Sequence, residues 1–102
     1  MIERHWSGIV RAGRADDYVR HLEGETFPAL RALPGFVRGR ILRRDVGEGT
    51  EFRIVTVWES LDAVRAFAGD EVELAVVPEL VQRMMVRFDP RVTHYAAVGG
   101  EP

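Results

Sequence analysis

The stretch Phe52-Arg-Ile-Val-Thr-Val-Trp58-Glu-Ser60-Leu-Asp-Ala-Val-Arg-Ala-Phe67 decides the fold, because it reads as a β-strand that runs directly into an amphipathic helix. Side chains alternate between the two sides of a strand. One side therefore carries Phe52, Ile54, Thr56 and Trp58. Ser60 can cap the helix that follows, whose apolar residues recur at helical spacing. The stretch predicts a strand that ends on a buried tryptophan beneath a helix.

The remaining sequence predicts three more strands and further helices around this unit. Residues of about 3–11 form a first strand, and residues 36–44 form a second one that a glycine-rich loop joins to the Trp58 strand. Between them lies an apolar helix that Gly24 and Pro28 should interrupt, since a proline ring collides with the carbonyl four residues back. Residues 71–85 should be helical in two pieces broken near Pro78. Asp89-Pro90 should then start the last strand.

This order of elements is β-α-β-β-α-β, the ferredoxin-like plan of the α+β class. It predicts one antiparallel four-stranded sheet with its helices on a single face. Val55 and Val57 lie opposite Trp58, so both faces of the sheet carry apolar residues and require cover. A chain of 102 residues is too short to supply that cover alone, which predicts a homodimer that packs sheet against sheet. We expect a single domain over residues 1–98 and a loose C-terminal tail over residues 99–102.

Composition excludes several classes of function. The formal net charge of −2 argues against nucleic acid as a partner, because phosphate binding requires a basic face. The chain contains neither cysteine nor lysine, which excludes a thiol nucleophile and a Schiff base. Its three histidines lack the spacing of metal ligands. No apolar run resembles a signal peptide or a membrane span, so we expect a cytoplasmic protein without a membrane partner.

A second signature closes the chain, at Phe88-Asp-Pro-Arg-Val92-Thr-His94-Tyr95-Ala-Ala-Val98. Together with the Trp58 stretch it resembles the antibiotic biosynthesis monooxygenase-like family. The resemblance implies a dimeric α+β barrel with a substrate cavity between sheet and helices. It also implies cofactor-independent oxidation of an electron-rich aromatic or polyketide-like molecule. Haem-degrading members of the superfamily carry an axial histidine on the helix after the tryptophan strand. Residues 64–70 contain none, so neither haem degradation nor any cofactor is expected.

The candidate catalytic residue is His94. A histidine inside an apolar strand is more often a hydrogen-bonded core residue, but the resemblance favours function, and an imidazole that titrates near neutral pH suits a proton acceptor. Because the last strand should lie beside the first, His5 or Trp6 is the expected cross-strand neighbour of His94. One arginine of the second strand could face the cavity and hold an anion.

The candidate substrate-binding residues are aromatic: Trp58, Tyr18, Trp6 and Phe67. Packing in the core explains Trp58 equally well. Two alternatives to the enzyme remain open, namely a non-catalytic module that binds or senses an aromatic small molecule, and a barrel filled by its own side chains. A cavity of several hundred cubic ångströms walled by His94 and Trp58 would favour an enzyme or a binding module. A filled interior would favour the last reading.

Overall fold

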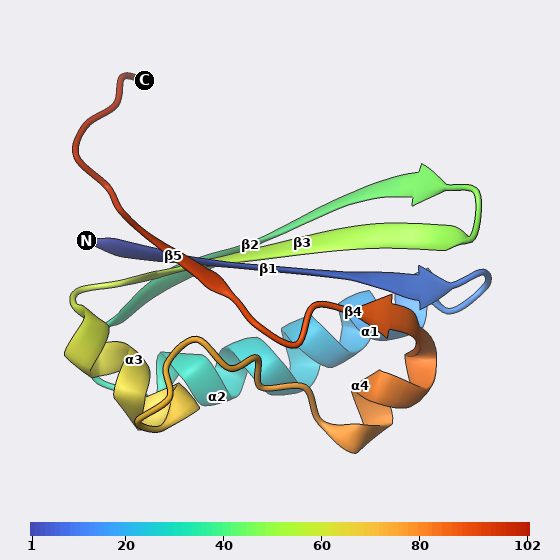
Figure 1. Ribbon diagram of the computed structural model, residues 1–102, viewed down its shortest axis with the longest axis horizontal. Helices are drawn as coiled ribbons and strands as arrows, with labels where there is room; N and C mark the ends of the chain where they lie inside the picture. The colour runs from blue at the N-terminus through green and yellow to red at the C-terminus, as the bar shows by residue number, and fades with distance from the viewer.

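A computed structural model describes residues 1–102 as an antiparallel sheet with every helix on one face (Figure 1). The elements are β1 (Ile2–Arg11), α1 (Ala15–His21), the π-helix η1 (Leu22–Thr26), α2 (Phe27–Arg31), β2 (Phe36–Val46), β3 (Gly49–Trp58), α3 (Leu61–Ala68), α4 (Glu79–Met84), β4 (Met85–Phe88) and β5 (Thr93–Ala96). This arrangement confirms the α+β class and the ferredoxin-like plan.

The sheet has the strand order β2-β3-β1-β4, and β5 also pairs with β1. Both short strands β4 and β5 thus lie along the same edge of β1, where the plan places its fourth strand. The register puts Arg4 opposite Thr56 on β3 and opposite His94 on β5. The cross-strand neighbour of His94 is therefore Arg4, and the expectation of His5 or Trp6 was wrong by one or two residues.

The segment before the last strand departs most from the prediction. Residues 71–78 form no helix, and the helical part is limited to α4. Backbone bonds hold this loop instead, from Ala75 N to the Pro90 carbonyl at 2.9 Å and from Val92 N to the Glu73 carbonyl at 2.8 Å. Helical geometry is unfavourable for the residue that precedes a proline. Pro78 therefore marks the start of α4 rather than a break within a longer helix. Asp89-Pro90 likewise does not start the last strand but separates β4 from β5.

The helical run after β1 is continuous through Gly24 and Pro28, which corrects the predicted interruption. The chain widens into a π-turn, in which the Phe27 N–H donates to the Leu22 carbonyl five residues back. Pro28 follows directly on this wider turn, as the second residue of α2. The wider turn therefore accommodates the proline without ending the helix.

The strand-to-helix unit matches its prediction. The Ser60 hydroxyl accepts a hydrogen bond from Ala63 N at 3.2 Å and so caps α3. Trp58 is fully buried, with its ring stacked on Phe67 at a centroid distance of 6.0 Å and edge-on to Phe36 at 5.2 Å. The indole N–H donates to the Thr56 hydroxyl at 2.9 Å, which satisfies its one polar atom.

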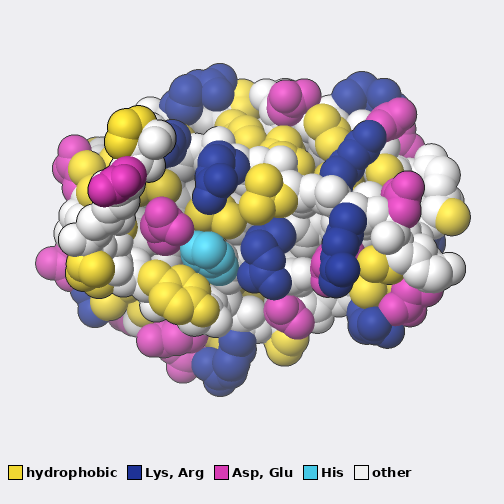
Figure 2. Space-filling model, turned by 90° about the horizontal axis from the view of Figure 1, so that it is seen from above, with side chains coloured by type: hydrophobic (Ala, Val, Ile, Leu, Met, Phe, Trp, Pro, Cys, Tyr) yellow, Lys and Arg dark blue, Asp and Glu magenta, His cyan; other side chains and the backbone are white.

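The other face of the sheet carries a row of arginines with apolar side chains between them (Figure 2). Val55 and Val57 are already buried on this face within the single chain, at 1% and 4% exposure. Their cross-strand partners are polar residues of β1 and β2, namely His5, Arg40, Glu3 and Arg38. The two valines therefore do not by themselves require a second subunit. The apolar side chains that remain open here include Leu42 and Tyr95. None of the helices meets the length and hydropathy that a membrane-spanning helix requires.

Candidate functional site

A cavity of about 430 Å³ lies between the sheet and the helices. The strands β1 and β3 supply its floor, and α1, η1, α2, α3 and the loop before α4 supply its walls. Fourteen of its twenty lining residues are hydrophobic. Such an apolar enclosure with a few polar groups is typical of sites for small organic molecules. The cavity therefore argues against a barrel filled by its own side chains.

The wall is rich in aromatic rings. Trp6, Tyr18, Phe27 and Phe67 all border the cavity. Tyr18 packs edge-on against Phe52 at a centroid distance of 4.9 Å, and Trp6 lies 6.5 Å from Tyr18. The Trp6 indole N–H donates to the Asp89 carbonyl at 2.8 Å, which fixes the ring. Three of the predicted substrate-binding residues, Trp6, Tyr18 and Phe67, are therefore brought together around one space that suits a flat ring system.

Tyr18 contributes the one phenol of the wall. Its side chain is buried, and its hydroxyl makes no hydrogen bond within the chain. Burial raises the pKa of Tyr18 well above its ordinary value, because the phenolate would lose its hydration. At neutral pH Tyr18 is therefore a hydrogen-bond donor available to an occupant of the cavity.

Arg4 is the polar residue on the cavity floor that the sequence reasoning missed. Arg4 is only 4% exposed, and it lies on the same face of β1 as Trp6, toward the helices. Nη1 donates to the Val72 carbonyl at 2.5 Å, Nη2 donates to the Leu74 carbonyl at 2.9 Å, and the guanidinium carbon lies 5.6 Å from the Phe67 ring centroid. Burial lowers the pKa of Arg4 to about 10, partly offset by the field of Glu73. Arg4 therefore remains a cation at neutral pH.

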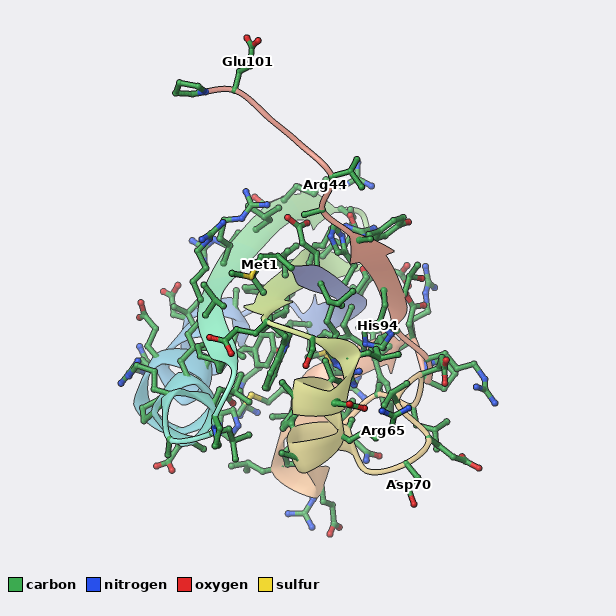
Figure 3. The ribbon with its side chains drawn as sticks, turned by 90° about the vertical axis from the view of Figure 1, so that its left-hand side faces the viewer. Met1, Arg44, Arg65, Asp70, His94 and Glu101 are labelled. Atoms are coloured by element: carbon green, nitrogen blue, oxygen red, sulfur yellow. The ribbon has the colours of Figure 1, made fainter.

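His94 lies on the helix side of the sheet, beneath β5 (Figure 3), but it does not border the cavity. Its Nε2 lies 3.0 Å from Nη1 of Arg4. Arginine can only donate, so Nε2 accepts and is unprotonated. Burial first, and then the charge of Arg4, lower the pKa of His94, with Glu73 acting in the opposite direction. The geometry thus makes His94 a neutral acceptor behind Arg4, without the direct access to a ligand that its predicted role requires.

Trp58 also stands one layer behind the wall. Phe67, on which it stacks, borders the cavity, whereas Trp58 does not. The histidine that does border it is His21, at the end of α1. The predicted second-strand arginines are absent from the lining as well.

Alternation along β1 could have found Arg4, because residues 4 and 6 must share a face once Trp6 is placed inward.

Comparison with known families gives a decisive result: residues 7–79 match the model of the antibiotic biosynthesis monooxygenase family. The chain belongs to this family. The match begins within β1 and ends at the start of α4, so it includes the strand-to-helix stretch but not Arg4, Trp6 or His94. No protein of curated function matches the sequence.

Solved structures share the antibiotic biosynthesis monooxygenase fold at low identity. A putative antibiotic biosynthesis monooxygenase from Bacillus cereus is 20% identical with a TM-score of 0.68, covering 99% of this chain and 94% of that one. The cofactor-independent oxygenase SnoaB from Streptomyces nogalater is 17% identical with a TM-score of 0.65, covering 99% and 96%. The haem-degrader MhuD from Mycobacterium tuberculosis, with two haems bound, is 20% identical with a TM-score of 0.69, covering both chains fully. At these identities the likeness concerns the fold.

Residues 59–78 offer no ligand to a haem iron. Protein ligands to haem iron are histidine, cysteine, methionine or tyrosine. None of these residue types occurs in residues 59–78, which form α3 and the wall segment after it. The residues of these types on the cavity wall, Tyr18 and His21, both lie on α1.

Proposed function

We propose that this protein is a cofactor-independent monooxygenase that oxidises an electron-rich aromatic or polyketide-like small molecule with dioxygen. The observation that carries the proposal is the cavity of about 430 Å³, apolar and walled by aromatic rings, in a member of the antibiotic biosynthesis monooxygenase family. A flat, hydrophobic substrate suits this space, and its apolar wall leaves little for water to bind around the reacting molecule.

The reaction needs little from the protein. Once deprotonated, an anthrone or hydroquinone can pass an electron to dioxygen, and an anthrone then combines with the reduced oxygen as a hydroperoxide. Loss of water leaves one oxygen atom in the product as a carbonyl, and the substrate supplies all the electrons. The protein has to promote deprotonation and stabilise the anion. Tyr18 and Arg4 are the donors placed for the second task.

Two imidazoles are candidates for the proton acceptor. His94 is the one that the sequence predicts, but its Nε2 already accepts a hydrogen bond from Arg4. His21 borders the cavity and has no hydrogen-bond partner in the chain that would block it. Direct transfer from a bound substrate therefore favours His21, and transfer to His94 would require Arg4 to move.

The test measures oxygen consumption with a panel of anthrones and hydroquinones, without added flavin or metal. Wild type is compared with His21→Ala and His94→Ala, and Arg65→Gln serves as a control on the outer surface of α3. Loss of the general base should lower the rate by ~10²–10⁴-fold. Rates equal to wild type in a histidine variant would remove that residue from the proton step. Absence of turnover with every panel member would contradict the oxidation of these classes.

A specific observation keeps a second function in view, namely a module that binds or senses an aromatic molecule. The predicted catalytic histidine is withdrawn behind Arg4, so the wall has a single imidazole, at the end of α1. Binding of a panel compound with micromolar affinity, together with no oxygen uptake, would favour the module.

We also propose that the protein functions as a homodimer. The support is the exposed apolar residues of the open sheet face, including Leu42 and Tyr95, and the dimeric assembly that the resemblance to this family implies. Pairing through this face would leave the cavity, on the opposite side of the sheet, within each subunit.

A further inference from the structure

Arg4 is a buried cation without an anionic partner. It takes part in none of the ion pairs of the chain. Its neighbours are two backbone carbonyls, a neutral histidine and the face of Phe67. The carboxylate that influences its pKa, Glu73, is exposed to solvent and forms no ion pair with it. An uncompensated charge in an apolar interior is costly unless it is paired.

The guanidinium is also held in place with donors to spare. Of its five N–H groups, two on Nη1 and one on Nη2 are taken by Val72, His94 and Leu74. The Nε N–H and the second Nη2 N–H have no acceptor in the chain. Because no fully buried side-chain nitrogen or oxygen lacks a partner, Nε keeps some contact with solvent, and Arg4 borders the cavity.

A second donor lies beside Arg4. Thr56 is its direct cross-strand partner on β3, borders the same cavity and is 6% exposed. The Thr56 oxygen already accepts from the Trp58 indole at 2.9 Å, so its own proton remains to be donated. The floor of the cavity thus offers a fixed guanidinium and an oriented hydroxyl side by side.

We propose that Arg4 and Thr56 form a carboxylate-binding subsite, and that the natural ligand of the cavity is an aromatic ring compound bearing a carboxylate. Only a group that is ionised at neutral pH compensates the charge of Arg4 throughout the physiological range, and a carboxylate is ionised there, whereas a simple phenol is not. Charge-assisted hydrogen bonds in a dry site fix such a group strongly. The inference rests on the proposed ligand cavity, but it does not depend on oxidation.

The test uses two probes of equal shape, 2-naphthoate and the neutral 2-naphthamide. Their dissociation constants are measured by isothermal titration calorimetry at neutral pH. Wild type should prefer the carboxylate by about 10- to 100-fold, the range expected of a hydrogen bond to a charged group. Arg4→Gln should abolish that preference and still bind the amide, and Arg65→Gln should behave as wild type. Equal affinity of wild type for both probes, or no binding of either, would overturn the proposal.

Arg4→Gln removes a group that also links β1 to the loop before α4, so its folding is checked by circular dichroism. Thr56→Val provides a second variant that deletes the hydroxyl at constant shape, and because it also removes the acceptor of the Trp58 indole N–H, its folding is checked in the same way. It should weaken 2-naphthoate several-fold and leave 2-naphthamide unchanged. An unchanged affinity for 2-naphthoate would remove Thr56 from the subsite. The role of the carboxylate is then decided by whether the wild-type protein prefers 2-naphthoate to 2-naphthamide.

His94 acts in this site as a positioning residue for Arg4. His94→Leu deletes the acceptor for Nη1, whereas His94→Gln can supply an amide oxygen in its place. The preference for 2-naphthoate should fall in His94→Leu and recover in His94→Gln. A preference that is the same in both variants would show that His94 does not orient the guanidinium.

Binding and oxidation can fail separately. Carboxylate preference that depends on Arg4, without oxygen uptake from any panel compound, would support the subsite and contradict the proposed monooxygenase. Oxygen uptake with no preference for the carboxylate probe would support the monooxygenase and overturn the subsite.

Discussion

Trp58 and Arg4 show how two buried side chains of one sheet face divide their tasks. Trp58 is fully buried between Phe36 and Phe67 and has its indole N–H satisfied by Thr56. Arg4 is also buried and borders the cavity, but it forms no ion pair within the chain. The first residue contributes packing energy, whereas the second holds a buried charge beside the cavity.

Trp58→Ala should destabilise the protein by ~3–5 kcal/mol, since it removes a buried indole and leaves a cavity between β3 and α3. The free energy of unfolding is measured with urea. Trp58→Phe is the matched control and should cost less, because it keeps an aromatic ring in the same space. A loss below ~1 kcal/mol for Trp58→Ala would contradict the packing beneath α3.

His94 should make stability depend on pH. Its pKa is lower in the folded chain than its ordinary value of 6.5, so between these two values the unfolded chain binds more protons. The contribution is complete above the unfolded pKa and is lost as the pH falls from near neutral toward the folded pKa. Urea unfolding across this range should show a shallower pH dependence for His94→Gln than for wild type. Parallel curves would show that His94 does not titrate differently on folding.

The turns between helices and strands restrict which residue can stand at a position, and the turn at Gly35 is the clearest example. The turn between α2 and β2 depends on Gly35, which has a φ of 86° and whose carbonyl accepts from Glu59 N at 2.8 Å. A side chain added there would approach the Ala63 Cβ to 2.5 Å, so the turn and α3 are fitted to each other. The π-turn η1 has no such neighbour at Gly24.

Gly35→Ala should therefore destabilise the protein, by ~1–2 kcal/mol from the positive φ and by a similar further amount from the clash with α3. Gly24→Ala is the matched control in the same helical connection. It has open space and an ordinary backbone, and it should be neutral or slightly stabilising because alanine restricts the unfolded chain. Thermal unfolding compares the two variants. Similar melting temperatures for both would mean that the turn adapts freely to a side chain.

The whole molecule presents a covered face and an open one. Helices cover one side of the sheet (Figure 1), and the cavity lies between them and the sheet. Arginines and apolar side chains share the other side (Figure 2). In the single chain Val55 and Val57 are already covered, so the free energy available from pairing comes from residues at and around Leu42 and Tyr95. An obligate interface on this face should bury well above ~1,200 Å² in total.

Sedimentation equilibrium at micromolar concentration should give the mass of a dimer. Leu42→Glu places a charge on the exposed face and should shift the equilibrium toward monomer, because desolvating an unpaired carboxylate is unfavourable. Leu80→Glu is the control, since Leu80 is an exposed leucine of α4 on the other side of the sheet. A stable folded monomer of the wild-type protein would rule out the homodimer.

The sequence by itself determined the class of fold, the strand-to-helix unit and the aromatic character of the wall, because these follow from local periodicity. Alternation placed Trp58 on the helix side, and the spacing after Ser60 specified α3. Tertiary structure alone decided three other features: the π-turn that carries Pro28, the unwound segment 71–78, and the cross-strand register. Each depends on partners distant in the sequence, which supply the backbone hydrogen bonds that a local pattern cannot predict. That register sets Arg4 between Thr56 and His94, and so brings a buried arginine to the cavity floor in front of the predicted histidine.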